Sequence, residues 1–417
     1  MPILSSNPLW EAFGLRALPY SLYGGADLGE CVTTMGRIGE GTAEDWYREW
    51  IATADRIAGI ARQSEQRGHW VSAREAYLRA TTYYHVSCFP LFGFPVDPRL
   101  RRAFEAEVSA FQSAAALLCP VVEPIEIPFE GRTLPGYFVP ASQGSGPRPT
   151  IVHVNGYDSN IQEMYFAHGP AATRRGYHCL LFDGPGQGRN LIRDGLSLRP
   201  DWETVVGPVI DYVLTRPEVD PERIVLAGWS FGGFLAPRAA AFEKRIAALI
   251  ADPGQWDQRA GLSALPVSPE ALQDLEHADP ALFAPVEQML RSPQADPLLR
   301  WRIVQRLFWV HGVTNLYDLA KEITRFEISS VVQHIGCPTL LTMAEGDPIA
   351  QGSRTLYEAL RCPKALVAFS VAEGSGGHCE ALARALYHQR VFDWLDETLH
   401  FNTESEGRYS TSAEVLG

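Results

Sequence analysis

Six short apolar runs, separated by segments long enough to form helices, constrain the fold of this 417-residue chain most strongly. The runs lie at 150–154, 179–182, 224–227, 248–251, 339–343 and 365–369. Strands that alternate with helices form βα units, whose strands pair in parallel. Such strands are buried on both faces, and continuously apolar runs are typical of that environment. We therefore expect an α/β fold with a mostly parallel central sheet flanked by helices.

The N-terminal part of the chain differs, because it contains helical patterns and no strand pattern. Apolar and aromatic residues recur at helical spacing over 46–61 and again over 70–88. A third helix is expected over 99–118, after prolines that end the preceding pattern. We therefore divide the chain into a helical domain at 1–120 and a sheet-containing domain at 121–400.

Four further segments complete this division. Alternating residues over 123–139 predict a hairpin, and the composition of 144–149 predicts a loop. The segment 256–334 is rich in Leu, Pro and Arg without a clear strand, so we expect a helical insertion or helices over one end of the sheet. Residues 401–417 are expected to form a loose polar tail.

Charge and composition exclude several kinds of partner. The chain has 49 acidic and 36 basic residues, a net charge of -13, whereas a nucleic acid or an anionic membrane requires a basic face. There is no apolar run of about 18 residues and no signal-peptide pattern at the N-terminus. Seven cysteines without CxxC spacing favour a cytoplasmic protein with no structural disulfide, and we expect no metal and no cofactor.

The motif Gly-Trp-Ser-Phe-Gly-Gly at 228–233 joins one apolar run to a helix-prone segment, 234–242. Small residues two positions either side of Ser230 allow the strand and the helix to pass closely. The strained turn exposes the serine Oγ near the N-terminus of the helix. This context favours a nucleophilic serine over a glycine-rich turn with an idle one.

A serine hydroxyl is a weak nucleophile unless a base takes its proton and an acid orients that base. In enzymes with a serine in such a turn, the acid and then the histidine follow it along the chain. His378 lies in a glycine-rich loop after the last apolar run, whereas His388 and His400 lie on and beyond a terminal helix. His378 is therefore the predicted base.

The acid should follow the strand before that loop. Asp347 comes soon after the run 339–343 and is our first candidate. Glu345 is a close competitor, and Asp252, at the end of an earlier run, is a second alternative. An Asp-Pro pair such as Asp347-Pro348 is also a common turn with no catalytic role.

An oxyanion intermediate would need two backbone N–H donors. We expect one from Phe231, directly after the serine, and the other from Tyr157 in the loop after an early strand. Gly156 would allow that loop to approach closely, although Asn155-Gly156 is also an ordinary turn sequence. The glycine-rich segment 183–188 lacks the Lys-Ser/Thr of a phosphate-binding loop, so we interpret it as a structural turn beside the site.

The substrate pocket is harder to predict, because aromatic residues at helical spacing are more often core than lining. Our candidates from the helical domain are Tyr84, His85 and Phe89. Asp158 and Trp229, next to the predicted donors and the serine, are candidates from the sheet domain.

Taken together, these motifs resemble one branch of the α/β-hydrolase superfamily. The branch contains 2,6-dihydroxypseudooxynicotine hydrolase, fungal polyketide-shortening hydrolases and FrsA-like esterases. The similar segments are 72–80 with the following Tyr83-Tyr84, 155–158, 183–188, 228–233, 337–339 leading to Gly346-Asp347, and 377–379. The resemblance extends from about 46 to 399.

The resemblance implies an α/β-hydrolase fold with an N-terminal helical cap, a homodimer, and a triad of Ser230, Asp347 and His378. Several members cleave a carbon–carbon bond next to a ketone, so we expect a small aromatic or polyketide-like substrate. The alternative is an esterase, thioesterase, acyltransferase or cyclase acting on a natural-product ester. A non-catalytic binding protein on the same scaffold is a third hypothesis, because a fold alone does not establish activity.

Overall fold

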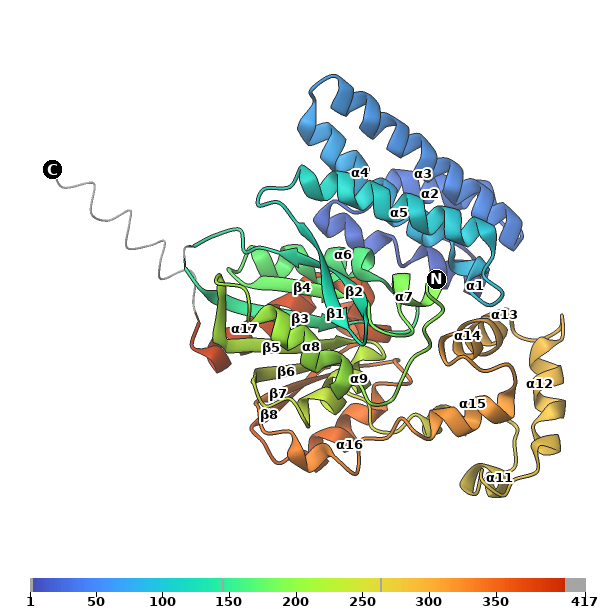
Figure 1. The fold of residues 1–417 in the computed structure, drawn as a ribbon. Helices are drawn as coiled ribbons and strands as arrows, with labels where there is room; N and C mark the ends of the chain where they lie inside the picture. The colour runs from blue at the N-terminus through green and yellow to red at the C-terminus, as the bar shows by residue number, and fades with distance from the viewer. Residues whose placement is uncertain (1–2, 145, 263–264, 402–417) are drawn as a thin grey trace.

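The computed structural model describes residues 3–144, 146–262 and 265–401, and the strands of these residues form one eight-stranded sheet (Figure 1). The strand order is β1-β2-β4-β3-β5-β6-β7-β8. The pairs β1–β2 and β2–β4 are antiparallel and the other neighbours are parallel, which confirms the expected mostly parallel sheet. The strands are β1 (Glu123–Phe129), β2 (Arg132–Val139), β3 (Arg148–Val154), β4 (His178–Phe182), β5 (Val219–Trp229), β6 (Ile246–Asp252), β7 (Thr339–Ala344) and β8 (Lys364–Phe369).

The six apolar runs lie within strands β3 to β8, and the predicted hairpin is formed by β1 and β2. Its turn places Glu130 and Gly131 at positive φ, 45° and 73°, the conformation of a two-residue hairpin connection. One boundary was wrong: 148–149 belong to β3 and not to a loop. The Arg148 amide donates to the Glu218 carbonyl, which extends the sheet beyond the apolar run.

The N-terminal region is helical throughout its regular elements. It comprises α1 (Pro8–Gly14), η1 (Leu18–Tyr23), α2 (Leu28–Ile38), α3 (Ala43–Gln66), α4 (Trp70–Ser87), η2 (Phe89–Leu91) and α5 (Pro98–Ala116). Thr42 and Asp45 form a reciprocal capping box that starts α3. These helices stack on one side of the sheet, and α4 and α5 contact α6 (Ile161–Thr173) (Figure 1).

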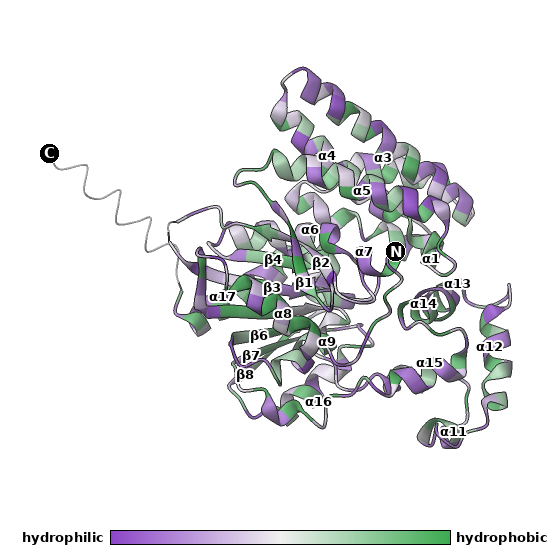
Figure 2. Cartoon of the chain, viewed as in Figure 1, coloured by the Kyte–Doolittle hydropathy of each residue, from purple (hydrophilic) through white to green (hydrophobic). Residues whose placement is uncertain are grey.

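Further helices cover the two faces of the sheet. They are α8 (Glu203–Val213), α9 (Gly232–Ala240), α16 (Gln351–Ala359) and α17 (Arg384–Leu399), together with α6. α9 packs on β5 and β6, which positions its N-terminus at the carboxyl end of β5. Figure 2 shows predominantly hydrophobic strands between helices whose outer faces are hydrophilic. None of the described helices is both long and apolar enough to span a membrane.

The connection between β6 and β7 is helical, as expected for 256–334, and lies beside one end of the sheet (Figure 1). Within its described residues, the one strand-like feature is an isolated bridge between Asp257 and Glu327. Part of it packs around a small hydrophobic core of its own, which includes Leu290, Leu316 and Leu319. Its helices are α10 (Arg259–Leu262), α11 (Pro269–Gln273), η3 (Pro280–Leu282), α12 (Ala284–Arg291), α13 (Pro297–Arg300), the π-helical η4 (Trp301–Leu307), α14 (Phe308–Val310), α15 (Leu316–Ile323) and η5 (Val332–His334).

An aromatic cluster joins the N-terminal region to this connection. Trp10 stacks on Trp46 with ring centroids 5.1 Å apart, and Phe13 contacts both Phe89 and Trp301 at 5.3 and 4.8 Å. The Trp301 indole N–H donates to the Phe89 carbonyl over 2.6 Å. Because these residues come from α1, α3, η2 and η4, the cluster holds together segments far apart in the sequence.

Replacing Trp46 by alanine should lower the free energy of unfolding by about 3–5 kcal/mol, because it removes a fully buried ring from this cluster. The matched control is Trp70→Ala, whose side chain is 57% exposed. We expect this control to change stability by less than about 0.5 kcal/mol. Urea denaturation followed by circular dichroism measures both, and equal losses would contradict the packing described here.

Candidate active site

Ser230 lies in the turn between β5 and α9 with φ +56°, an uncommon conformation for a residue with a side chain. The turn is tight because a Cβ at Gly228 would lie 2.0 Å from the Gly232 carbonyl oxygen. A Cβ at Gly232 would lie 2.2 Å from the Val154 carbonyl oxygen. The Ser230 amide donates to the Asp252 carbonyl over 2.7 Å, which fixes the strained residue to the end of β6. The glycines of the motif therefore have the steric function that the sequence indicated.

The structure brings Ser230, His378 and Asp347 together. The Ser230 Oγ lies 2.8 Å from His378 Nε2, and His378 Nδ1 lies 2.9 Å from Asp347 Oδ2. Asp347 is buried and its other oxygen accepts the Ile349 N–H, whereas His378 remains open to the surroundings of the serine. These are the contacts expected of a nucleophile, a base and an orienting acid.

Two adjacent loops position the histidine and the carboxylate. Asp347 follows β7, and His378 opens η7 (His378–Ala383) after β8. The Gly377 amide donates to the Glu345 carbonyl over 2.8 Å and so fastens one loop to the other. Parallel strands end at the same edge of the sheet, which explains why residues 31 positions apart meet there.

The alternative acids lie elsewhere. The Glu345 carboxylate accepts the Val371 N–H over 2.8 Å, away from the histidine. Asp252 accepts the Thr342 hydroxyl over 2.9 Å and pairs with Arg384 at 3.4 Å. Among the described contacts of His378, Asp347 is the carboxylate partner.

The backbone of the loop after β3 passes directly over Ser230. A Cβ at Gly156 would lie 2.9 Å from the Ser230 Cβ, 3.1 Å from its Oγ and 3.4 Å from the Phe231 nitrogen. The Phe231 amide opens α9, where the first N–H groups of a helix have no partner within it. The Tyr157 ring stacks on the Phe231 ring at 4.1 Å, so the two expected donor residues are neighbours.

Gln187 holds the loop after β3 in place through hydrogen bonds. Its side-chain amide donates to the Asn155 and Gly156 carbonyls at 2.7 and 3.3 Å, and its oxygen accepts the Gly184 N–H. Asn155 in turn donates to Asp183 over 3.3 Å. Burial raises the pKa of Asp183 to about 7. The sequence indicated that 183–188 is a structural turn beside the site, and in the structure its side chains also hold the loop after β3.

A cavity of about 320 Å³ opens beside Ser230 and His378. Two of the candidate pocket residues, Asp158 and Trp229, line it. Much of the remaining lining was not predicted: it includes Phe13 of α1, Tyr20 of η1 and Arg16 between them, and Trp301, Arg302 and Arg306 from η4. Neither segment has a motif or a periodicity that signals a binding site, and they become lining only through tertiary packing.

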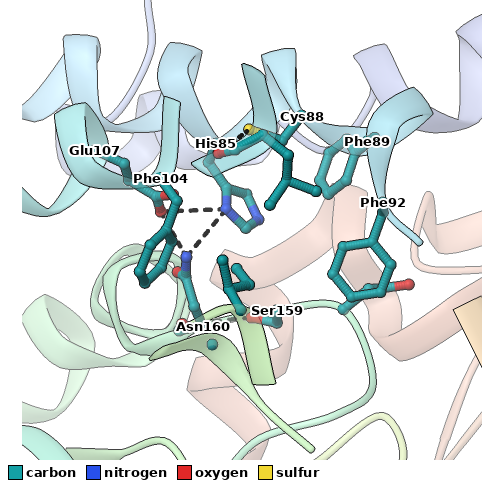
Figure 3. Close-up of a pocket in the computed structure, with 12 residues that line it drawn as sticks. His85, Cys88, Phe89, Phe92, Phe104, Glu107, Ser159 and Asn160 are labelled. Atoms are coloured by element: carbon teal, nitrogen blue, oxygen red, sulfur yellow. Dashed lines mark hydrogen bonds and ion pairs between the residues drawn. The ribbon is translucent and has the colours of Figure 1, made fainter. Parts of the chain in front are cut away.

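Tyr84, His85 and Phe89 are not brought to this cavity. The Tyr84 hydroxyl donates to Asp55 within the helical region. His85 and Phe89 line a separate cavity of about 30 Å³, where His85 points toward Glu107 and Asn160 (Figure 3). The sequence pattern predicted that α4 packs against other elements. The part of the cavity lining that comes from the N-terminal region is supplied instead by α1, η1 and the residues between them.

A buried charge network joins the walls of the two cavities, since Asp158 lines both. Asp158 pairs with Arg16 at 2.8 Å and with Arg306 at 2.7 Å, and Arg16 also contacts Glu163. Burial alone would raise the pKa of Asp158, but the two guanidinium groups hold it well below its usual range. Asp158 thus lines the cavity as an ionised carboxylate whose charge is balanced by the two arginines.

His85 extends this network as a cation. Its ring nitrogens lie 3.1 Å from Glu107 and 3.3 Å from Glu163. Burial alone would lower the pKa of His85, but the two carboxylates outweigh it and raise the value to about 10.

Among the described residues, no cluster of three or more His, Cys, Asp or Glu side chains is arranged to hold a metal ion.

Comparison with known proteins identifies the class that this fold and site define. A model of the alpha/beta hydrolase family matches residues 151–390, and a model described as esterase FrsA-like matches residues 33–254. The chain belongs to the alpha/beta hydrolase family and is a hydrolase, which confirms the resemblance.

Similar proteins extend over nearly the whole chain. Hydrolase LUC6 of Fusarium sp is 33% identical, with 92% of this chain and 95% of the relative covered. The 20-hydroxy-prefusarin hydrolase FUS2 of Gibberella moniliformis is also 33% identical over the same shares. The solved structure of 2,6-dihydroxy-pseudo-oxynicotine hydrolase has the same fold, with a TM-score of 0.72 at 23% identity and 92% and 95% coverage.

Replacing Gly156 by alanine should slow the reaction of Ser230 at least about 100-fold, because the added methyl group occupies the space above the Oγ and the Phe231 amide. The labelling rate with a fluorophosphonate probe measures this effect. Gly207→Ala is the control, since a Cβ there meets no atom within 4 Å. Labelling of the Gly156 variant at the normal rate would contradict the position of this loop.

The raised pKa of Asp183 predicts a pH dependence of stability. Its proton is bound more tightly in the folded state than in the unfolded state, where a carboxyl pKa is about 3.9. The stabilising effect is therefore complete below about pH 4 and is lost as the pH rises to about 7. Asp183→Asn should remove this loss, which amounts to up to about 4 kcal/mol.

Urea denaturation at pH 5 and pH 8 measures the difference. The wild-type protein should lose more stability between these values than the Asp183→Asn variant does. The exposed Asp194 offers the control Asp194→Asn, which should retain the wild-type pH dependence. An unchanged pH dependence in Asp183→Asn would show that this carboxyl titrates normally.

Proposed function

We propose that this chain is a serine hydrolase in which Ser230 attacks a carbonyl carbon, His378 takes the serine proton and Asp347 orients and stabilises the imidazolium. The observation that carries this proposal is the continuous hydrogen-bonded chain from the Ser230 Oγ through both ring nitrogens of His378 to Asp347. A serine in a strained turn, with a base within 2.8 Å, has the geometry that nucleophilic catalysis requires.

The proposed reaction has two stages. As the Oγ–carbon bond forms, the proton moves to His378 Nε2 and the carbonyl oxygen becomes an oxyanion that accepts from the Tyr157 and Phe231 amides. The intermediate collapses, the leaving group departs with the electron pair of the broken bond, and His378 returns the proton to it. Water, activated by His378, then hydrolyses the acyl-Ser230 ester and restores the serine.

We propose that the bond cleaved is a carbon–carbon bond next to a ketone in a polyketide-like or aromatic small molecule. The leaving carbanion would be stabilised as an enolate or a phenolate-type anion before it takes the proton. The name of the 33% identical relative, 20-hydroxy-prefusarin hydrolase, supports a small organic substrate. The cavity of about 320 Å³, with Phe13, Leu298 and Trp301 in its wall, has a size and an apolar character that fit such a molecule.

An ester or thioester is the second candidate substrate. It is favoured by the match of residues 33–254 to the FrsA-like esterase model. The same residues would act, with an alkoxide or thiolate as the easier leaving group. Transfer of the acyl group to another nucleophile, or cyclisation, would follow if the cap excluded water from the cavity.

We further propose that residues 1–120 act as a cap over the catalytic domain at 121–400. Arg16 and Tyr20 line the cavity together with Ser230, which supports this role. The cap would then determine which molecules reach the serine.

An aryl ester and a matching aryl 1,3-diketone, assayed side by side, test the reaction type. Carbon–carbon hydrolysis predicts cleavage of the diketone, and Ser230→Ala should lower kcat for either substrate by at least about 1000-fold. Cleavage of the ester alone would assign the esterase activity instead. Turnover that survives in Ser230→Ala would contradict the proposed nucleophile.

A further inference from the structure

The charged groups around the cavity are almost completely paired with one another. Arg16 and Arg306 share Asp158, and Arg16 also contacts Glu163. His85, protonated at neutral pH, lies between Glu163 and Glu107. The described network therefore balances three cations with three carboxylates.

A third arginine of the cavity wall, Arg384, is also paired. Arg384 lies 3.4 Å from Asp252 and donates to the Cys379 carbonyl over 2.9 Å. Beside the serine, the Asp347 carboxylate is in contact with His378 Nδ1 at 2.9 Å. These contacts leave little capacity to bind a further charged group.

Arg302 differs from these groups. It lines the same cavity as Ser230 and His378, at the exposed side of η4, and within the described parts of the chain its guanidinium makes no ion pair and no hydrogen bond. Partial burial and the charge of Arg306 lower the pKa of Arg302. Asp158, Asp296 and Asp347 act in the opposite direction, but none of them is in ion-pair contact with it. Among the described residues of the cavity wall, Arg302 is therefore the cation available to a ligand.

We infer that Arg302 binds a carboxylate of the substrate, at a part of the molecule distinct from the carbonyl group that Ser230 attacks. The inference rests on the proposed function for the position of the reacting carbon. A guanidinium presents parallel N–H donors that match the two oxygens of a carboxylate. A single unpaired positive charge is balanced by a monoanion, whereas a phosphate group carries close to two negative charges near neutral pH.

The rest of the wall agrees with a substrate that is charged at one end only. Phe13, Leu15, Leu298, Trp301 and Leu382 supply apolar surface to the same cavity. A long neutral body would bury its surface there, and the carboxylate would remain near Arg302 at the exposed side.

Matched esters measure the preference. We would compare the para-nitrophenyl hemiesters of glutaric, adipic and suberic acids, which have a free distal carboxylate, with the same compounds as neutral methyl esters. In the wild-type protein, the acid of the best-fitting length should have the higher kcat/KM. Arg302→Gln should lower the acid-to-methyl-ester ratio about tenfold or more, mainly through KM, because a charge-assisted hydrogen bond is lost.

Arg300→Gln is the matched control. It removes the same charge two residues earlier in the chain, and the Arg300 side chain does not line the cavity. This variant should leave the ratio unchanged. An unchanged ratio in Arg302→Gln at all three lengths, or an equal fall in Arg300→Gln, would overturn the inference. If Arg302→Gln does not fold, Arg302→Lys keeps the charge without the paired donors and should give an intermediate ratio.

Binding without turnover separates this inference from the proposed function. Calorimetry with Ser230→Ala should detect tighter binding of monomethyl adipate than of dimethyl adipate, and adding Arg302→Gln should abolish the difference. If the wild-type protein turns over neither ester but this difference is present, the proposed function fails and the carboxylate site stands. If the esters are hydrolysed through Ser230 and the difference is absent, or if a phosphate analogue is preferred, the carboxylate site fails alone.

Discussion

Asp158 is a buried carboxylate held between two guanidinium groups, and the candidate site depends on this contact. Arg16 comes from the N-terminal region, Asp158 from the loop that follows β3, and Arg306 from the connection between β6 and β7. Removing a carboxylate from water is costly unless opposite charges and hydrogen bonds replace the lost solvent. Loss of either arginine would leave the negative charge undercompensated, so the three segments are constrained to meet at one place beside the serine.

The network around Asp158 contributes specificity of arrangement more than net stability. A buried ion pair often stabilises a protein no better than apolar residues of similar size, because desolvation offsets the attraction. An arrangement in which Glu163 and His85 are displaced, however, would leave several buried charges without partners. The aromatic contacts of Phe13 and Trp301 supply the apolar part of the same junction. Charges thus select the relative position of the segments, and rings provide much of the buried area.

The residues at the carboxyl edge of the sheet were predictable from the sequence, because each is tied to a local pattern. Ser230 follows an apolar run and precedes a helix, and Asp347 and His378 occupy loops after successive strands. A parallel sheet brings such loops to one edge whatever the details of packing. The choice of Asp347 over Glu345, three and one residues after β7, was less determined by sequence, because it depends on the direction of each side chain within one short loop.

The wall of the cavity was not predictable in the same way. Helical periodicity predicts that α4 packs through one face, whereas its residues 80–87 are all buried, and periodicity does not identify the elements that cover them. Tyr84 therefore lies against Asp55, and Arg16 and Tyr20 occupy the position expected for residues of α4 and η2. The lining by η4 depends on how the helical connection between β6 and β7 packs beside the end of the sheet, and no motif in 256–334 indicates that packing.

The separation between the residues that surround Ser230 and those that form the outer wall has an evolutionary consequence. The serine, its partners and the backbone above it belong to loops of the sheet, whereas Phe13, Leu298 and Arg302 belong to segments that carry no part of that machinery. Substitutions in these segments change the shape and charge of the space offered to a molecule while the reacting atoms stay where they are. Proteins that descend from such a chain can therefore acquire different substrates while they keep the same reaction chemistry.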